Sequence, residues 1–215
     1  MLFSGGNIQE TLLGMAYSIP ALLIGLTFHE AAHAFMANRC GDPTARNLGR
    51  LSLDPLRHLD LVGSLSLLLL GFGWAKPVPV NPRNFRNPRR DEIYVSLAGI
   101  LTNIILAFIF TGILVGVSKL NFDIKAVEII YTIVLYTALI NVVLAVFNLL
   151  PIPPLDGYRV LRTSIRGGEN VFRFLERYGF FVLIALLFLL RRVNIISKIA
   201  YAVLNMFAAF FELIF

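Results

Sequence analysis

The chain has 215 residues, 57% of them hydrophobic and 15% charged, whereas soluble domains of this size stay near about 50% apolar. This composition excludes an ordinary soluble enzyme, and the single cysteine, Cys40, excludes an internal disulfide framework. The formal net charge of +6 does not indicate nucleic acid as a partner, because the Lys and Arg residues crowd the segments between apolar blocks, as in proteins oriented in a lipid bilayer.

Six apolar stretches follow one another and predict an all-α polytopic membrane protein. Residues 8–38 exceed one bilayer crossing, so we expect this helix to be tilted, bent near Pro20 or extended beyond the membrane. Residues 61–74 are too few to cross as a helix and are glycine-containing, which favours a re-entrant or interfacial hairpin. Residues 93–117 and 127–150 are each long enough to cross, and residues 172–190 and 193–215 form a predicted C-terminal hairpin.

The predicted organisation is a single membrane-embedded domain over residues 1–215, with about five to six transmembrane helices and the short hairpin segment. Its core covers residues 8 to about 165, and the C-terminal helical hairpin covers about 172–215. No long internal repeat and no second soluble domain are expected.

The basic residues predict an orientation. With the N-terminus outside and the hairpin segment returning to its own side, all but five of the 19 Lys and Arg residues lie on the inner side. The exceptions are Lys119, Lys125, Arg191, Arg192 and Lys198. The C-terminal part of the first helix and residues 148–157 then both lie near the cytosolic face. The lack of a targeting peptide favours a prokaryotic plasma membrane.

The first apolar stretch ends in the sequence HEAAH at residues 29–33. In a helix, His29 and His33 lie four residues apart on one face and can direct two imidazoles to one metal ion. Glu30 is placed to take a proton from water at that metal. In the His-Glu-x-x-His pattern the two histidines bind the metal and the glutamate acts as the base. The pattern predicts a zinc hydrolase, because ionisable groups within a membrane helix are costly and mark function.

A catalytic zinc ion usually takes three protein ligands, and two candidates remain for the third. His58 lies in a polar, arginine-containing segment between two apolar stretches. Asp156 follows a long apolar run interrupted by prolines, where a carboxylate needs a partner. We favour Asp156 over His58.

Three asparagines within apolar runs are further candidates. Asn148 is a predicted hydrogen-bond donor to a developing oxyanion, although a buried amide that bonds to a neighbouring helix is an equally good interpretation. Asn103 and Asn141 carry the same two interpretations. Ala98 and Gly99 indicate close helix packing at that point of the chain.

These residues resemble those of the site-2 proteases, a family of intramembrane zinc metalloproteases. The resemblance rests on FHEAAH at residues 28–33, on NLLPIPPLDG at residues 148–157, and on the order of the two elements. The stretches GFGWAKPVPVNP and SLAGILTN are also similar to those of compact, bacterial-type members. One departure is Ile100, where the family commonly has proline.

The resemblance implies one zinc ion bound by His29, His33 and Asp156, with Glu30 as the general base and Asn148 positioning or polarising the scissile carbonyl. It implies cleavage within or near transmembrane segments of membrane proteins, for regulated intramembrane proteolysis or the clearance of membrane fragments. We expect no PDZ or CBS module within these 215 residues.

A membrane metal transporter or metal-binding protein that uses the same ligands is the alternative function, although it has no evident need for a base beside His29. The expected partners are transmembrane substrates and the lipid bilayer, and self-association into a homo-oligomer is left open. We also hypothesise that residues 61–81 guide or hold the unwound substrate.

Overall fold

The computed structural model describes residues 8–60, 62–63, 66, 75–119 and 125–214. Within these residues the only β-type pairing is an isolated antiparallel bridge between Leu59 and Ala75. Two short 3-10 helices, η1 (Pro55–Arg57) and η2 (Pro82–Asn84), lie in the segment between the first two long helices. The α-helices are α1 (Ile8–Cys40), α2 (Thr44–Asn47), α4 (Pro88–Ser118), α5 (Lys125–Asn148), α6 (Asp156–Ser164), α7 (Glu169–Val193) and α8 (Ile195–Glu212).

Four of the described helices are long and apolar enough to cross a membrane: Leu12–Cys40 within α1, Pro88–Ser118, Val127–Asn148 within α5, and Ile195–Glu212. Large apolar side chains remain exposed on their outer faces, among them Leu101, Ile105 and Ile109 of α4. Such faces suit contact with lipid rather than water. The prediction of an all-α polytopic membrane protein is therefore confirmed.

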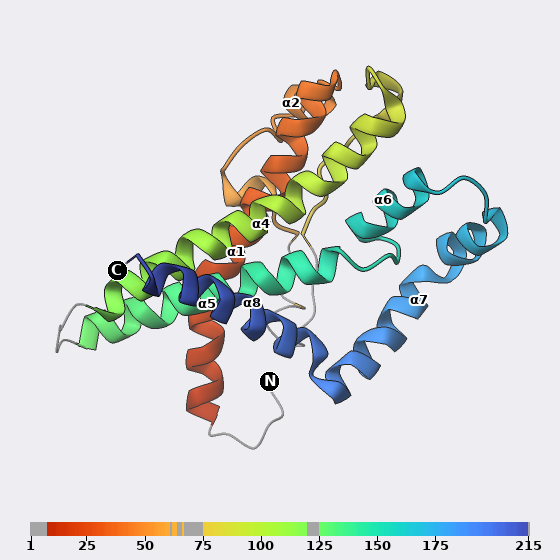
Figure 1. The fold of residues 1–215 in the computed structure, drawn as a ribbon. Coiled ribbons are helices and arrows are strands. Elements are labelled where there is room, and N and C mark those ends of the chain that lie inside the picture. Colours follow the sequence, from red (N-terminus) through yellow and green to blue (C-terminus); the bar gives the residue numbers. More distant parts are fainter. Residues whose placement is uncertain (1–7, 61, 64–65, 67–74, 120–124, 215) are drawn as a thin grey trace.

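Helices α1, α4 and α5 pack against one another, and α1 crosses the α4–α5 pair in Figure 1. Helix α8 packs against this group as well. The small residues Ala107, Ala138 and Ala200 bring α4, α5 and α8 into one buried cluster. Two asparagines, Asn103 and Asn141, are fully buried within the three-helix core. Burying such amides is costly unless they are hydrogen-bonded, so each needs partners within the core.

Helix α1 continues without interruption through Pro20 and ends at Cys40, directly before a glycine. Gly41 has a φ of 109°, which L-residues rarely adopt, and the Asp42 N–H donates to the carbonyl of Ala37 at 2.9 Å. This is the geometry of a Schellman helix end. A side chain at Gly41 would also meet the Asn84 carbonyl oxygen at 2.9 Å, so the end of α1 is packed directly against η2.

The C-terminal part holds α6 against α7. Leu183 of α7 is buried with Ile152 and Leu155 of the loop between α5 and α6. Helices α7 and α8 meet at Asn194, which has a φ of 52°. Helix α8 packs mainly against α4 and α5, so the C-terminal hairpin stays a prediction. The uncharged run of α7, residues 178–190, has a helical length of only about 20 Å. The predicted re-entrant hairpin over residues 61–74 falls almost entirely outside the described residues.

Candidate metal centre and catalytic base

His29 and His33 lie one turn apart on the same face of α1, as the spacing predicts. Both are buried, and their Nε2 atoms are 3.0 Å apart with the two rings nearly perpendicular. Gly99 of α4 faces the ring of His29 so closely that an added Cβ would lie 2.5–2.7 Å from three ring atoms. Glycine at this position therefore makes the room that His29 occupies.

The other nitrogen of each imidazole meets an acceptor. His29 Nδ1 is 2.6 Å from the Asn103 side-chain oxygen, and His33 Nδ1 is 2.7 Å from the backbone carbonyl of Val95. The Asn103 amide nitrogen is committed elsewhere, because it donates to the Gly25 carbonyl at 3.1 Å and to the Asn141 side-chain oxygen at 2.8 Å. Each Nδ1 therefore donates, and in a neutral imidazole Nε2 then carries a free lone pair.

Asp156 brings a carboxylate to these two lone pairs from the first position of α6. Its Oδ2 lies 3.2 Å from the Nε2 atom of His29 and 3.2 Å from that of His33. Gly157 permits this placement, because a side chain there would overlap the carbonyl oxygen of Leu149.

The three donor atoms form a site that fits zinc. Asp156 Oδ2 is buried without a hydrogen-bond donor, and the three atoms lie within 4.8 Å of one another. Tetrahedral zinc with bonds near 2.05 Å would separate its ligand atoms by about 3.3 Å, close to the 3.0–3.2 Å seen here. Two imidazoles and one carboxylate also form the donor set of many catalytic zinc sites.

Glu30 belongs to α1 but lies outside this donor set. Its side chain is almost buried, and its Oε2 accepts a hydrogen bond of 2.8 Å from the backbone N–H of Val78. One carboxylate oxygen is thus held by the chain, while Oε1 makes no hydrogen bond within the described residues. A base beside a metal site needs such a free oxygen.

The remaining candidates lie in other environments. Asn148 donates its side-chain amide to the Leu144 carbonyl of its own helix at 3.0 Å, so its role toward a substrate carbonyl stays a prediction. His58 is fully buried, and its Nε2 is 2.7 Å from the Ser52 carbonyl. Asp156 and not His58 accompanies the two histidines in the structure. Ile100, the departure from the family pattern, is buried in an uninterrupted α4.

Sequence reasoning did not foresee the hydrogen bond of Val78 to Glu30, because a backbone donor leaves no mark in the sequence. It gave Asn103 two interpretations, and the structure brings that residue to His29. The spacing of Gly99 and Asn103, four residues apart on one face of α4, is the signal that both face the same partner.

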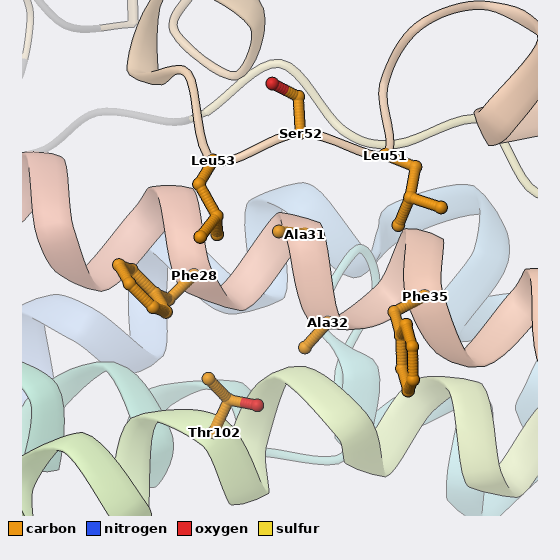
Figure 2. Close-up of a pocket in the computed structure, with 8 residues that line it drawn as sticks. All are labelled: Phe28, Ala31, Ala32, Phe35, Leu51, Ser52, Leu53 and Thr102. Carbon is orange, nitrogen blue, oxygen red and sulfur yellow. The ribbon is translucent and has the colours of Figure 1, made fainter.

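A hollow of about 410 Å³ lies on another face of α1, between that helix, α4 and the 51–53 loop. Figure 2 shows Phe28 and Phe35 at its two ends and Thr102 of α4 below Ala32. The lining residues include none of the three donors and not Glu30. The donor set is thus enclosed between helices rather than exposed in this hollow.

The chain is similar to known proteins. Residues 115–190 match the model of Peptidase family M50. "Putative zinc metalloprotease YwhC" of Bacillus subtilis (strain 168) is 42% identical over 178 residues, which cover 80% of each chain. "Putative zinc metalloprotease MJ0611" of Methanocaldococcus jannaschii is 32% identical over 162 residues, 75% of this chain and 76% of the relative. "Putative zinc metalloprotease Rip2" of Mycolicibacterium smegmatis is 31% identical over 175 residues, 79% of this chain and 65% of that relative. No solved structure matches the chain.

Proposed function

We propose that His29, His33 and Asp156 bind the zinc ion of this protein. The chain belongs to Peptidase family M50, the site-2 proteases, and is therefore an intramembrane zinc metalloprotease. The observation that carries this proposal is the convergence of two imidazole lone pairs and one carboxylate oxygen, none of which has a hydrogen-bond donor of its own in the tautomers that Asn103 and Val95 impose.

Glu30 is the proposed general base. Bound zinc would supply Lewis acidity and bring the pKa of water near 7. Glu30 takes a proton from water at its free Oε1 and returns it to the leaving amine, while Oε2 remains hydrogen-bonded to Val78. The role proposed for Asn148 is to donate to the scissile carbonyl, which requires its amide to leave the Leu144 carbonyl.

The proposed substrates are transmembrane segments of membrane proteins, cleaved for signalling or to clear membrane fragments. The support is that His29 and His33 lie on α1, one of the long helices with apolar side chains exposed on their outer faces. A substrate helix that reaches this site arrives from the lipid, and it must unwind before its peptide bond becomes accessible. The three proposed ligands belong to one chain, and self-association into a homo-oligomer stays a prediction.

The proposed location is a prokaryotic plasma membrane, with the site near the cytosolic face. His29 and His33 lie toward the C-terminal end of α1, and the chain after that end is rich in arginine, as expected for an inner side. Single cysteines placed at Arg166 and Lys119 in a Cys40→Ala background would test this orientation. An impermeant maleimide should label residue 119 in right-side-out vesicles and residue 166 only in inverted ones; the reverse labelling would overturn it.

The catalytic proposal is tested with purified wild type, Glu30→Gln and Glu128→Gln, the last an exposed carboxyl at the start of α5 that serves as a matched control. Each is assayed for zinc content and for cleavage of peptides that contain a transmembrane segment. We expect zinc in all three and cleavage by all but Glu30→Gln. Cleavage by Glu30→Gln would refute its role as base.

The ligand set is tested separately. Asp156→Asn should lose zinc, whereas His58→Ala should keep it, because His58 bonds to the Ser52 carbonyl instead. Zinc retained in Asp156→Asn and lost in His58→Ala would restore His58 as the third ligand. Metal transport, the alternative function, requires no base, so the Glu30→Gln comparison also separates the two functions.

A further inference from the structure

The segment that crosses Glu30 has few backbone donors. Residues 75–84, called the strap here, read AKPVPVNPRN, and prolines at 77, 79 and 82 have no N–H. Each proline also restricts the residue before it to extended conformations. Between residues 76 and 81 only Lys76, Val78, Val80 and Asn81 can donate a backbone hydrogen bond.

Three of these four donors are engaged with the rest of the protein. The Lys76 N–H donates to the His58 carbonyl at 2.9 Å. The Val78 N–H donates to Glu30 Oε2 at 2.8 Å, and the Asn81 N–H donates to Asp42 Oδ2 at 2.7 Å. The Val80 N–H makes no hydrogen bond among the described residues. The strap therefore delivers one central N–H to Glu30 and anchors itself on either side of it.

The two anchors are strong. Upstream, the guanidinium of Arg50 donates to the Lys76 carbonyl at 2.6 Å. Downstream, Asp42 is fully buried and accepts from the side-chain amide of Asn84 at 2.8 Å as well as from Asn81. Asp42 itself is fixed at the Schellman end of α1, so it ties the strap to the helix that carries Glu30. Val78 is also buried, against Ala34 of α1 and Ala45.

From these contacts we infer that the Val78 N–H positions Glu30 for catalysis and that Asp42 is a positioning residue that holds the strap at this register. The inference rests on the proposed role of Glu30 as the base. A carboxylate on a flexible side chain samples several rotamers, and a charge-assisted hydrogen bond at Oε2 restricts it to one. The other oxygen then stays directed at the same place in each turnover, which is the condition for efficient proton transfer.

The direct test removes one backbone hydrogen-bond donor. A backbone ester at Val78, made with the α-hydroxy analogue of valine, replaces the N–H by oxygen and keeps the side chain. The matched control is the same ester at Val80, whose N–H makes no hydrogen bond in the described part of the chain. Both full-length proteins are compared with wild type for zinc content, thermal stability, and kcat and KM on a transmembrane peptide. We expect kcat to fall about tenfold to a hundredfold for the Val78 ester alone, with KM and zinc unchanged.

Asp42→Asn gives a second, genetic test. An amide cannot accept from all the donors that surround this carboxylate, so we expect the strap to loosen and kcat to fall by a similar factor at a temperature well below Tm, again with zinc and KM unchanged. Wild-type kcat in Asp42→Asn would overturn its positioning role.

The outcomes separate this inference from the proposed function. An inactive Glu30→Gln together with wild-type kcat in the Val78 ester would refute the positioning role alone. An active Glu30→Gln would instead refute the proposed base. An equal loss of kcat in the Val78 and Val80 esters would show a general effect of the ester on the strap and would overturn the inference.

Discussion

Gly99→Ala is the substitution that tests the metal centre most sharply, because it adds one methyl group beside a zinc ligand and removes nothing. The new Cβ would lie 2.5 Å from Cε1 of His29 and 2.7 Å from both Nδ1 and Nε2. Ordinary van der Waals contact begins near 3.4 Å. Relief therefore requires the ring to move by about 0.9 Å, or α4 to move away from α1 by as much.

Neither movement is compatible with the site. Metal–ligand distances tolerate only about 0.2 Å, so the shift removes His29 from the coordination sphere. A shift of α4 would instead stretch the hydrogen bonds from His29 to Asn103 and from His33 to the Val95 carbonyl. We expect zinc affinity to fall at least about 100-fold, equivalent to roughly 2.7 kcal/mol, with about 1–3 kcal/mol of overpacking lost from stability.

The control is Gly116→Ala on the same helix, where an added Cβ meets nothing within 4 Å. It should keep zinc and gain up to about 1 kcal/mol of stability from helix propensity. Zinc affinity is measured by competition with a chromogenic chelator, and stability by thermal unfolding in detergent with and without zinc. Wild-type zinc affinity in Gly99→Ala would show that the close contact does not position His29.

Three further outcomes are expected. Asn103→Leu should lower zinc affinity by about 10–100-fold in the chelator assay, because it leaves the His29 Nδ1–H without its acceptor; unchanged affinity would contradict this. Burial raises the pKa of Asp42, but hydrogen bonds from Thr44, Asn81 and Asn84 lower it by more, so the net pKa is lowered. The stability that ionised Asp42 contributes is therefore present above about pH 4 and lost as the pH falls further. The Tm difference between wild type and Asp42→Asn should shrink over that range, and a constant difference would refute this. Burial and the hydrogen bond to Glu176 raise the pKa of Tyr158 to about 12. In chemical unfolding experiments, Tyr158→Phe should therefore lose about 1 kcal/mol of stability below pH 10 and progressively less toward pH 12. Equal stabilities of the two proteins at pH 8 would argue against the hydrogen bond between Tyr158 and Glu176.

The helices and the donor set could be predicted because each depends on a local pattern. Apolar length predicts membrane helices directly, and the four-residue spacing places His29 and His33 on one face without knowledge of any other helix. Asp156 could be singled out because a carboxylate after a long apolar run needs a partner. What that argument could not supply is the contact itself, which depends on Gly157 seating α6 against the Leu149 carbonyl.

The contacts that position the site could not be predicted, because they join residues far apart through atoms that every residue shares. Val78 and Glu30 are 48 residues apart, and the donor is a backbone N–H. The role of Asn103 depends on which way its amide faces, which Gly25 and Asn141 decide. The uncharged run of α7 differs from these contacts, because the charged residues at both of its ends make it visibly shorter in the sequence than those of α4 and α5.

The strap has one more consequence, which concerns how an extended polypeptide could align beside it. The carbonyl oxygens of residues 77–80 accept no hydrogen bond within the described part of the chain, whereas Val80 alone retains a free backbone donor there. Among the described residues, this part of the strap is therefore rich in unpaired acceptors and almost without donors. It cannot form a full ladder with a copy of itself, which limits edge-to-edge aggregation. A guest chain would be held mainly through its own N–H groups, so proline in the guest would weaken binding more than a change of side chain.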